Sequence, residues 1–228
     1  MPSHARRHQL QQSLVYHAFS RSSGRREIFH NPRDFAYFKK LIKDYTDKFG
    51  ISVYHWVIMP NHYHLVLELD VPESISGFMA GLHRAYSHYY CRRYDTVGFL
   101  WQGRFKLQPV QKEAYLKNCG RYVERNPVRS GFVKEACEYN YGSARFYCLG
   151  EEDGITKMSP YFDEFGNNIR ARQVAYKEFL SVLDRGDEDR FSGAGIICGD
   201  KVFIGKLVKM NGHYFPRRNG RRRLSGES

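Results

Sequence analysis

The stretch ISVYHWVIMPNHYHLVLEL, Ile51 to Leu69, contains two apolar runs separated by the dipeptide Pro-Asn. β-Branched and aromatic residues dominate both runs, so the pattern predicts strands at 51–59 and 62–69. The short polar break between the runs is typical of a hairpin turn. This hairpin is the centre from which the rest of the fold can be assigned.

The segments on either side of the hairpin alternate between strand and helix periodicity. A strand is predicted at 13–20, and a helix at 32–49 begins after the N-cap Asn31 and ends at Gly50. Beyond the hairpin, the pattern predicts a helix, a strand and a second helix at 73–94, 103–111 and 112–126. Pro127 disfavours helical geometry in the residue before it, so the last helix should end near Asn126. The order β-α-β-β-α-β predicts an α+β fold with a ferredoxin-like sheet and an extra C-terminal helix.

The charge of the chain favours a polyanionic partner. Of the 228 residues, 36 are Lys or Arg and 24 are Asp or Glu, which gives a formal net charge of +12. Nucleic acid is the first candidate partner and a membrane surface the second. No apolar run is long enough for a secretion signal or a membrane span, so we expect a cytoplasmic protein. The five cysteines form no CxxC motif and are expected to be reduced packing residues.

The charge is unevenly distributed along the chain, which suggests a domain boundary. Residues 1–150 hold 22 basic and 12 acidic side chains, whereas residues 151–190 hold 6 and 10. The acidic turn cluster GEEDG begins at Gly150 and is typical of a linker. We therefore predict a main domain at 1–148 and a C-terminal extension at 149–228. In the extension, 174–193 is predicted to be a helix with an acidic turn, and 196–210 a strand or short helix.

Two histidines, His62 and His64, lie at the start of the second hairpin strand. Residues two apart in a strand point to one face, on the order of 6–7 Å apart, so two imidazoles there can converge on one ion. That face is opposite the apolar series that begins at Tyr63 and looks like core. The pattern taken alone also fits a pair of surface histidines, and a metal site needs a third ligand.

The predicted helix 112–126 offers such a ligand. Tyr122 and Asn126 are four residues apart, so they share one helical face, and Tyr115 lies two turns earlier on nearly the same face. Packing roles for the tyrosines and a helix-ending role for Asn126 are the simpler explanations of each residue alone. Together with the histidine pair and the basic charge, they fit a phosphoryl-transfer site.

Four segments give the chain a family resemblance: MPNHYHLVLEL, LWQGRFK, AYLKNCGRYVERNPVRSGFV and YNYGSARFY. In order and spacing they resemble the one-tyrosine HUH transposases, especially the REP-associated tyrosine transposases, over about residues 10–148. The resemblance implies that Tyr122 is the nucleophile and that His62, His64 and Asn126 hold a divalent ion. Better-known relatives have Gln where this chain has Asn126, and both side chains offer an amide oxygen.

The resemblance implies attack of the tyrosine on single-stranded DNA hairpins, with a 5′-phosphotyrosine and a free 3′-OH as products. Two neutral imidazoles and a neutral amide leave the ion its full charge, and such a ligand set suits Mg²⁺ or, with its nitrogen ligands, Mn²⁺. The relatives imply a monomer more strongly than a homodimer.

Basic residues interleaved with aromatic residues predict the DNA-binding surface. The arginines of the loop after the first strand, those of the helix and loop that follow the hairpin, and those of the tail are the candidates: Arg21, Arg25, Arg26, Arg84, Arg92, Arg93, Arg104, Lys106, Arg217, Arg218, Arg221, Arg222 and Arg223. A solvated loop and a solvated tail are the alternatives.

Two other functions fit part of the pattern. A hairpin-binding regulator without catalysis would keep the basic surface and would not need the tyrosine or the histidines. A metal-independent RNA endonuclease on the same fold would use a histidine and the RNA 2′-OH, and it would keep its activity in EDTA.

Overall fold

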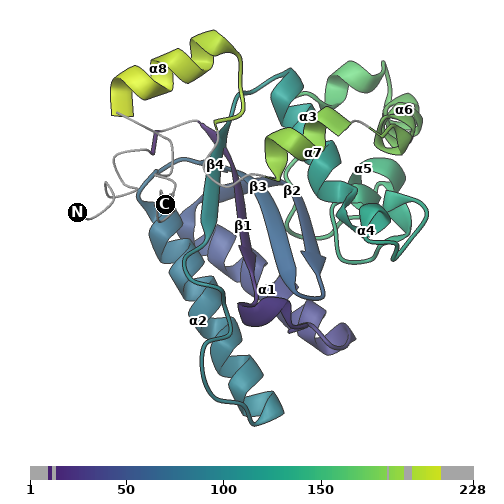
Figure 1. Cartoon of the computed structure of the whole chain (residues 1–228). Coiled ribbons are helices and arrows are strands. Elements are labelled where there is room, and N and C mark those ends of the chain that lie inside the picture. The colour runs from purple at the N-terminus through teal and green to yellow at the C-terminus, as the bar shows by residue number, and fades with distance from the viewer. Residues whose placement is uncertain (1–9, 12–13, 184, 193–196, 212–228) are drawn as a thin grey trace, which may run out of the picture.

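The computed structural model describes residues 10–11, 14–183, 185–192 and 197–211, and its centre is a four-stranded antiparallel sheet (Figure 1). The strands are β1 (Val15–Arg21), β2 (Ile51–Met59), β3 (His62–Leu69) and β4 (Lys106–Val110), in the order β2-β3-β1-β4. With helices between β1 and β2 and between β3 and β4, this is the ferredoxin-like arrangement, so the predicted fold class is confirmed.

One face of the sheet is covered by α1 (Pro32–Phe49) and α2 (Ser74–Tyr94) (Figure 1). Local sequence sets the bounds of α1. Asn31 and Asp34 form a capping box at its start, and Gly50 ends it with a left-handed φ of 61°. The core on this side takes one side-chain series from β3: Tyr63, Leu65, Leu67 and Leu69.

The other face of the sheet lies under α3 (Ala114–Glu124) and the short α4 (Asn126–Arg129). An irregularity in the β2–β3 register between Val53 and His55 places His55 on this side, and Val57 and Met59 also belong to its core. The helix end predicted near Asn126 agrees with the structure to within two residues. Helix α3 ends at Glu124, and Asn126 begins α4 with Pro127 in its first turn, where a missing N–H costs nothing.

Beyond α4 the chain forms a series of short helices, of which α6 and α7 pack against α3. The structure has α5 (Ala144–Leu149), α6 (Ile169–Ser181), α7 (Arg185–Phe191) and α8 (Lys201–Asn211), with 3-10 turns at Ser23–Arg25, Ala136–Glu138 and Phe162–Phe165. The helix predicted within 174–193 is part of α6, but the acidic turn predicted after it is wrong, because this segment forms the helix α7. The segment predicted as strand or short helix at 196–210 contains α8, and Cys198 forms a parallel bridge to Val110 of β4. The domain boundary between residues 148 and 149 stays a prediction.

Two further expectations concern the whole chain. All five cysteines are free thiols, as predicted. Among the described residues, no helix is both long and apolar enough to cross a membrane.

Candidate active site

Three histidines meet on the sheet face beneath α3. His62 and His64 come from β3, and His17 comes from the neighbouring strand β1, where Phe19 is the direct partner of His64. His17 is therefore a diagonal neighbour of His64 on the same face. The His64 ring centroid lies 5.2 Å from that of His62 and 5.0 Å from that of His17. His17 and His64 are buried, so the histidines face away from the first core, as predicted, but lie under a second layer.

Tyr122 of α3 lies over these histidines. Its ring makes edge contacts with His17 and His64, at centroid separations of 5.8 and 5.9 Å. The guanidinium of Arg129 from α4 stacks on the same ring, 4.1 Å from its centroid. Tyr115, seven residues earlier on the same helix, instead lies beneath the guanidinium of Arg190. Of the two tyrosines, Tyr122 is the one that the structure brings to the histidines.

Asn126 is held in a fixed orientation next to His62. Its amide nitrogen donates to the carbonyl oxygens of Tyr122 and Val123, at 3.1 and 3.0 Å, so it also caps the end of α3. Both amide hydrogens are used in this way, and the side-chain oxygen is therefore the group that faces His62, with which Asn126 interacts. The sequence-predicted set His62, His64, Tyr122 and Asn126 is brought together.

The imidazoles in this cluster are neutral at physiological pH. Burial is the largest cause: it lowers the pKa of His17 to about 4 and of His62 to about 4, and the pKa of His64 well below its ordinary value. The positive charges of Arg21 and Arg129 lower the pKa of His62 and His64 further. A neutral imidazole keeps a ring-nitrogen lone pair, which is the form that binds metal ions.

The residues fit a divalent ion. Among the described residues, no three His, Cys, Asp or Glu side chains form a metal-binding group, so an ion here would depend on the amide oxygen of Asn126 as third ligand. His62 Nδ1 lies 2.6 Å from Asn61 Oδ1, and Asn126 forms a second side-chain hydrogen bond with the His62 ring. A divalent ion held by His62 and the Asn126 oxygen would replace the proton of that second hydrogen bond.

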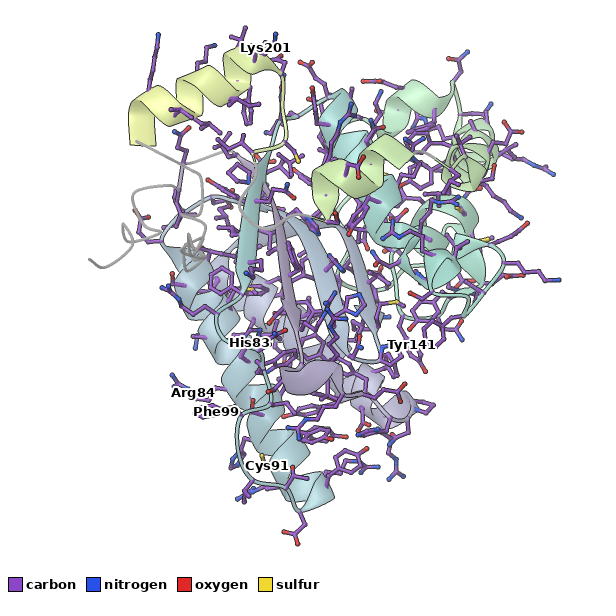
Figure 2. All side chains as sticks on the ribbon, in the orientation of Figure 1. His83, Arg84, Cys91, Phe99, Tyr141 and Lys201 are labelled. Atoms are coloured by element: carbon purple, nitrogen blue, oxygen red, sulfur yellow. The ribbon has the colours of Figure 1, made fainter. Side chains whose placement is uncertain are left out.

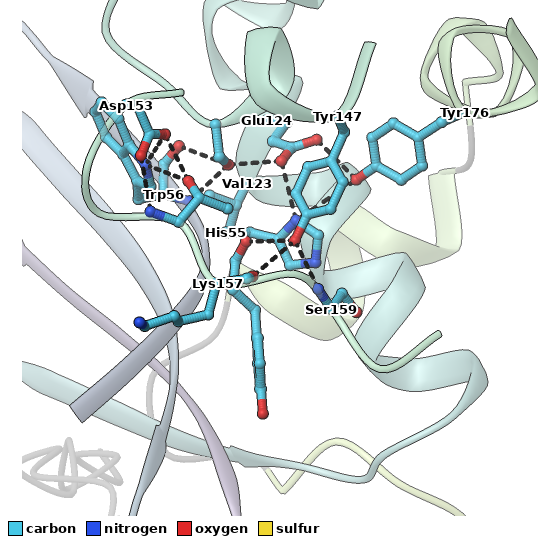
Figure 3. A network of polar contacts seen from close by, with 12 residues as sticks. His55, Trp56, Val123, Glu124, Tyr147, Asp153, Lys157, Ser159 and Tyr176 are labelled. Carbon is cyan, nitrogen blue, oxygen red and sulfur yellow. Dashed lines mark hydrogen bonds and ion pairs between the residues drawn. The ribbon is translucent and has the colours of Figure 1, made fainter. Parts of the chain in front are cut away.

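A buried polar network fixes the far side of α3 (Figure 3). The carboxylate of Glu124 accepts from Ser143 Oγ at 2.6 Å and from Tyr176 Oη at 2.8 Å, and pairs with His55 Nδ1 at 2.9 Å. Both His55 and Glu124 are almost fully buried. Because Glu124 lies between Tyr122 and Asn126 in sequence, these bonds set the rotation that points the two functional side chains at the histidines.

The predicted basic residues within the described part of the chain are all exposed, and their loops are tied together. They are Arg21, Arg25, Arg26, Arg84, Arg92, Arg93, Arg104 and Lys106. The loop after β1 pairs with the loop before β4, because Ser23 N donates to Leu100 O and Gln102 N donates to Arg21 O, both at 2.8 Å. Arg93 also forms an ion pair with the buried Asp34. The five predicted tail arginines, 217–223, lie outside the described residues.

The aromatic residues of this region differ in exposure. Tyr86, Tyr90 and Trp101 are buried in the core, whereas Tyr89, Tyr94 and Phe105 are half-buried. Phe99 is 90% exposed, and its carbonyl oxygen accepts from Arg26 Nη2 at 3.2 Å. Figure 2 labels Phe99 on the loop that follows α2, and Arg84 on that helix.

Three residues at the site were not predicted from the sequence: His17, Gln108 and Arg129. The alternation within β1 is a usable signal for His17, since it places His17 on the face opposite Tyr16 and Ala18. Gln108 is the direct β4 partner of His17, and strand pairing of that kind has no local signal in the sequence. Arg129 follows Tyr122 by seven residues, which is two helical turns.

Comparison with known proteins places the chain among the DNA transposases. Residues 10–126, about half of the chain, match the family model described as "Transposase IS200 like". The chain belongs to the IS200-like transposase family. No curated protein matches it.

Two solved structures match this chain to different degrees. One is a REP-associated tyrosine transposase bound to a REP hairpin, with a TM-score of 0.56 and 15% identity over 74% of this chain and 93% of that chain. The other is a putative transposase from Deinococcus radiodurans R1, with a TM-score of 0.38 and 18% identity over 49% of this chain and 88% of that chain. The first of these shows that the ferredoxin-like fold found here is that of a REP-associated tyrosine transposase.

Proposed function

We propose that this transposase nicks and rejoins single-stranded DNA hairpins of the REP type through a covalent bond to Tyr122. The observation that supports this most strongly is the placement of the Tyr122 ring within 6 Å of the His64 ring, with Asn126 one turn further along and beside His62. A nucleophile, two neutral imidazoles and an amide oxygen thus share one buried corner of the fold.

The residues define the proposed reaction. The Tyr122 Oη attacks the phosphorus of a phosphodiester and loses its proton, a new O–P bond forms, and the bond from phosphorus to the 3′ oxygen breaks. The 3′ oxygen leaves as a hydroxyl after it takes up a proton, and the 5′ phosphate remains on Tyr122. Because the phosphotyrosine keeps the energy of the phosphodiester, the 3′-OH can reverse the step and join strands without ATP.

His62, His64 and the Asn126 oxygen would hold Mg²⁺ or Mn²⁺. When bound, the divalent ion supplies positive charge that polarises the scissile phosphate and stabilises the leaving oxygen. Arg129, stacked on Tyr122, places a second positive charge at the phenol, where negative charge develops. Because the tyrosine and the histidines meet within one chain, the site needs no partner subunit, which supports the proposal of a monomer.

The exposed basic residues of the two paired loops and of α2 are the proposed DNA contacts. The two loops meet beside the histidines, since Arg21 is the register partner of His62. The solved REP-associated relative is bound to a REP hairpin, and this supports the same class of ligand here. The tail arginines, 217–223, are proposed to add contacts to the hairpin backbone.

Replacement of Tyr122 by Phe tests the proposal. The change removes one hydroxyl, so we expect loss of both strand cleavage and the covalent protein–DNA adduct on a denaturing gel, with hairpin binding retained. Tyr115→Phe is the matched control, because Tyr115 lies on the same helix against Arg190, and it should form the adduct at the normal rate. An adduct that survives Tyr122→Phe and disappears with Tyr115→Phe would assign the nucleophile to Tyr115.

EDTA separates the alternative functions. We expect it to stop cleavage of a labelled single-stranded hairpin and Mn²⁺ or Mg²⁺ to restore it. A metal-independent RNA endonuclease would continue to cut RNA in EDTA, whereas a hairpin-binding regulator would bind without any cleavage in either condition.

A further inference from the structure

A hydrogen-bonded chain leads from His64 through the interior to the C-terminal extension. His64 Nδ1 lies 2.7 Å from His17 Nε2, and His17 Nδ1 lies 3.2 Å from Gln108 Oε1. Gln108 Nε2 then lies 2.8 Å from the carbonyl oxygen of Arg190 and 2.9 Å from the thiol of Cys198. His17 and Gln108 are completely buried and take no direct part in the proposed reaction.

We propose that His17 and Gln108 are positioning residues that fix which ring nitrogen of His64 is free to bind the metal ion. This inference rests on the proposed function only in assigning His64 as a ligand. The tautomer itself follows from the direction of the hydrogen bonds in the metal-free protein.

The direction is set at Gln108. The carbonyl of Arg190 can only accept, so the nitrogen of the Gln108 amide must face it, and the opposite orientation would place two oxygens 2.8 Å apart. The Gln108 oxygen therefore faces His17 and accepts from Nδ1–H of that ring. A neutral imidazole carries one hydrogen, so His17 Nε2 is an acceptor and His64 Nδ1 must be the donor to it. His64 Nε2 is left with its lone pair.

His62 also has an acceptor at Nδ1. Asn61 Nδ2 donates to the carbonyl oxygen of Arg25 at 3.0 Å, which turns Asn61 Oδ1 toward His62 Nδ1. Asn126 forms a second hydrogen bond with the same ring. A neutral imidazole carries one hydrogen for these two acceptors, so hydrogen-bond direction fixes the tautomer of His64 but not that of His62.

The series of hydrogen bonds that begins at His64 ends at residues of the C-terminal extension. Arg190 lies in the last turn of α7, and the backbone of Cys198 is hydrogen-bonded to Pro109 of β4 and to Gln111 just after it. These contacts hold the acceptor that orients Gln108. The geometry thus assigns residues near 190 and 198 a role in preparing the metal ligand, although they lie more than 120 residues from it in sequence.

Nuclear magnetic resonance of the unmodified, metal-free protein at pH 7.5 tests the tautomers directly. Long-range ¹H–¹⁵N spectra distinguish the protonated ring nitrogen of each histidine, and we expect His17 and His64 both to be protonated on Nδ1. Protonation of His64 on Nε2 would overturn the proposal. This measurement needs no variant, so it decides even where a substitution prevents folding.

Measurements of metal binding show whether the hydrogen bonds of His17 and Gln108 prepare His64 as a ligand or only satisfy buried polar groups. His17→Leu removes the acceptor for His64, and we expect Mn²⁺ binding, measured by electron paramagnetic resonance, to weaken about 10- to 100-fold. His17→Gln restores an acceptor at similar reach and should bind Mn²⁺ within a few-fold of the wild-type chain. His83→Leu, on the opposite face of the sheet against Tyr63, is the matched control and should leave Mn²⁺ binding unchanged.

The outcomes separate this inference from the proposed function. Wild-type Mn²⁺ affinity in a folded His17→Leu chain would show that the pair is only structural. A wild-type chain that binds Mn²⁺ with the expected tautomers but never cleaves DNA would refute the proposed function and leave the positioning role intact.

Discussion

At the scale of single residues, Tyr122 combines a stacked guanidinium with contacts to the histidines. Arg129 lies 4.1 Å from its ring centroid, and Arg129 and Arg21 are cations that lower the pKa of His62 and His64. Arg129 thus places positive charge against the Tyr122 ring and also helps to keep the neighbouring imidazoles neutral.

Arg129→Ala should slow covalent adduct formation by about 10- to 100-fold, because a preorganised charge beside the developing phenolate is lost. The rate is measured in a single turnover on a hairpin oligonucleotide, with hairpin affinity measured separately by fluorescence anisotropy. Arg170→Ala, at an exposed position of α6, removes an equal charge away from the site and serves as control. Equal rates for the two variants would show that Arg129 only packs on the ring.

Sequence reasoning reached the residues that carry a short-range pattern. His62 and His64 are two apart in one strand, and Tyr122 and Asn126 are four apart, so each pair shares a face by local geometry alone. His17 and Gln108 join them only through the pairing of β1 with β3 and β4, and strand order is a property of the whole chain. The placement of the predicted quartet agrees with the structure, whereas its chemical roles remain proposals.

At the scale of elements, α3 depends on its closeness to β2. Gly120 faces His55, and an added Cβ would lie 2.7 Å from two atoms of that ring. The ring cannot move aside easily, because it is stacked on Tyr147 and paired with Glu124. The absence of a side chain at Gly120 thus brings Tyr122 within reach of the histidines.

Gly120→Ala should therefore destabilise the fold by about 1–3 kcal/mol through overpacking, in spite of the better helix propensity of Ala. Adduct formation should also slow, because α3 must shift. Gly205→Ala in α8 is the matched control: no atom lies within 4 Å of the added Cβ, and a gain of about 0.5–1 kcal/mol is expected. Thermal melts and single-turnover rates measure both effects, and equal stability of the two variants would contradict the close packing.

The loop before β4 carries the exposed Phe99 next to the arginine loop. If a nucleobase stacks on this ring, Phe99→Ala should weaken binding of a single-stranded oligonucleotide by about 1–3 kcal/mol, and Phe99→Trp should preserve it. Because the ring is 90% exposed, the melting temperature should not change. Ile169→Ala, at a 53% exposed position of α6, is the control for loss of exposed apolar surface. Unchanged anisotropy titrations for Phe99→Ala would remove it from the interface.

Element bounds were predictable where the signals are local. The capping box at Asn31 and the left-handed Gly50 define α1 to the residue. Helix α3 ends at Glu124, close to the predicted end at Asn126, and the near-helical backbone at Arg125 leads straight into α4. Helix α7 was not predicted, because residues 184–190 contain no apolar side chain and so carry no helical periodicity.

At the scale of the whole molecule, the extension completes the second face of the sheet. Arg121 of α3 forms a buried ion pair with Asp187 of α7, and Phe191 lies 5.6 Å from the Tyr122 ring. The sequence suggested an appended segment, because residues 151–190 are net acidic whereas residues 1–150 are net basic. That same acidic character supplies Asp187 as a partner for α3, a role that composition alone does not reveal.

Burial of neutral histidines on both faces of the sheet predicts acid sensitivity of the metal-free protein. His17 and His62 on one face and His83 on the other each have a pKa of about 4, chiefly through burial, against an ordinary value near 6.5. Between these values the unfolded chain binds more protons than the folded chain, so stability is complete above about pH 6.5 and falls as the pH drops toward 4. At pH 5 the loss should be about 2 kcal/mol for each histidine.

Urea denaturation at pH 7.5 and pH 5 measures this loss, and the midpoint should fall markedly at the lower pH. His83→Leu removes one of four such histidines, His64 included, without touching the metal ligands, so it should reduce the difference between the two midpoints by about a quarter, since each histidine contributes a similar amount. The same urea midpoint at pH 7.5 and pH 5 would contradict this prediction. It would mean that the protonated imidazoles gain compensating partners in the folded chain, although His17 and His64 are buried and a buried charge without a partner is costly.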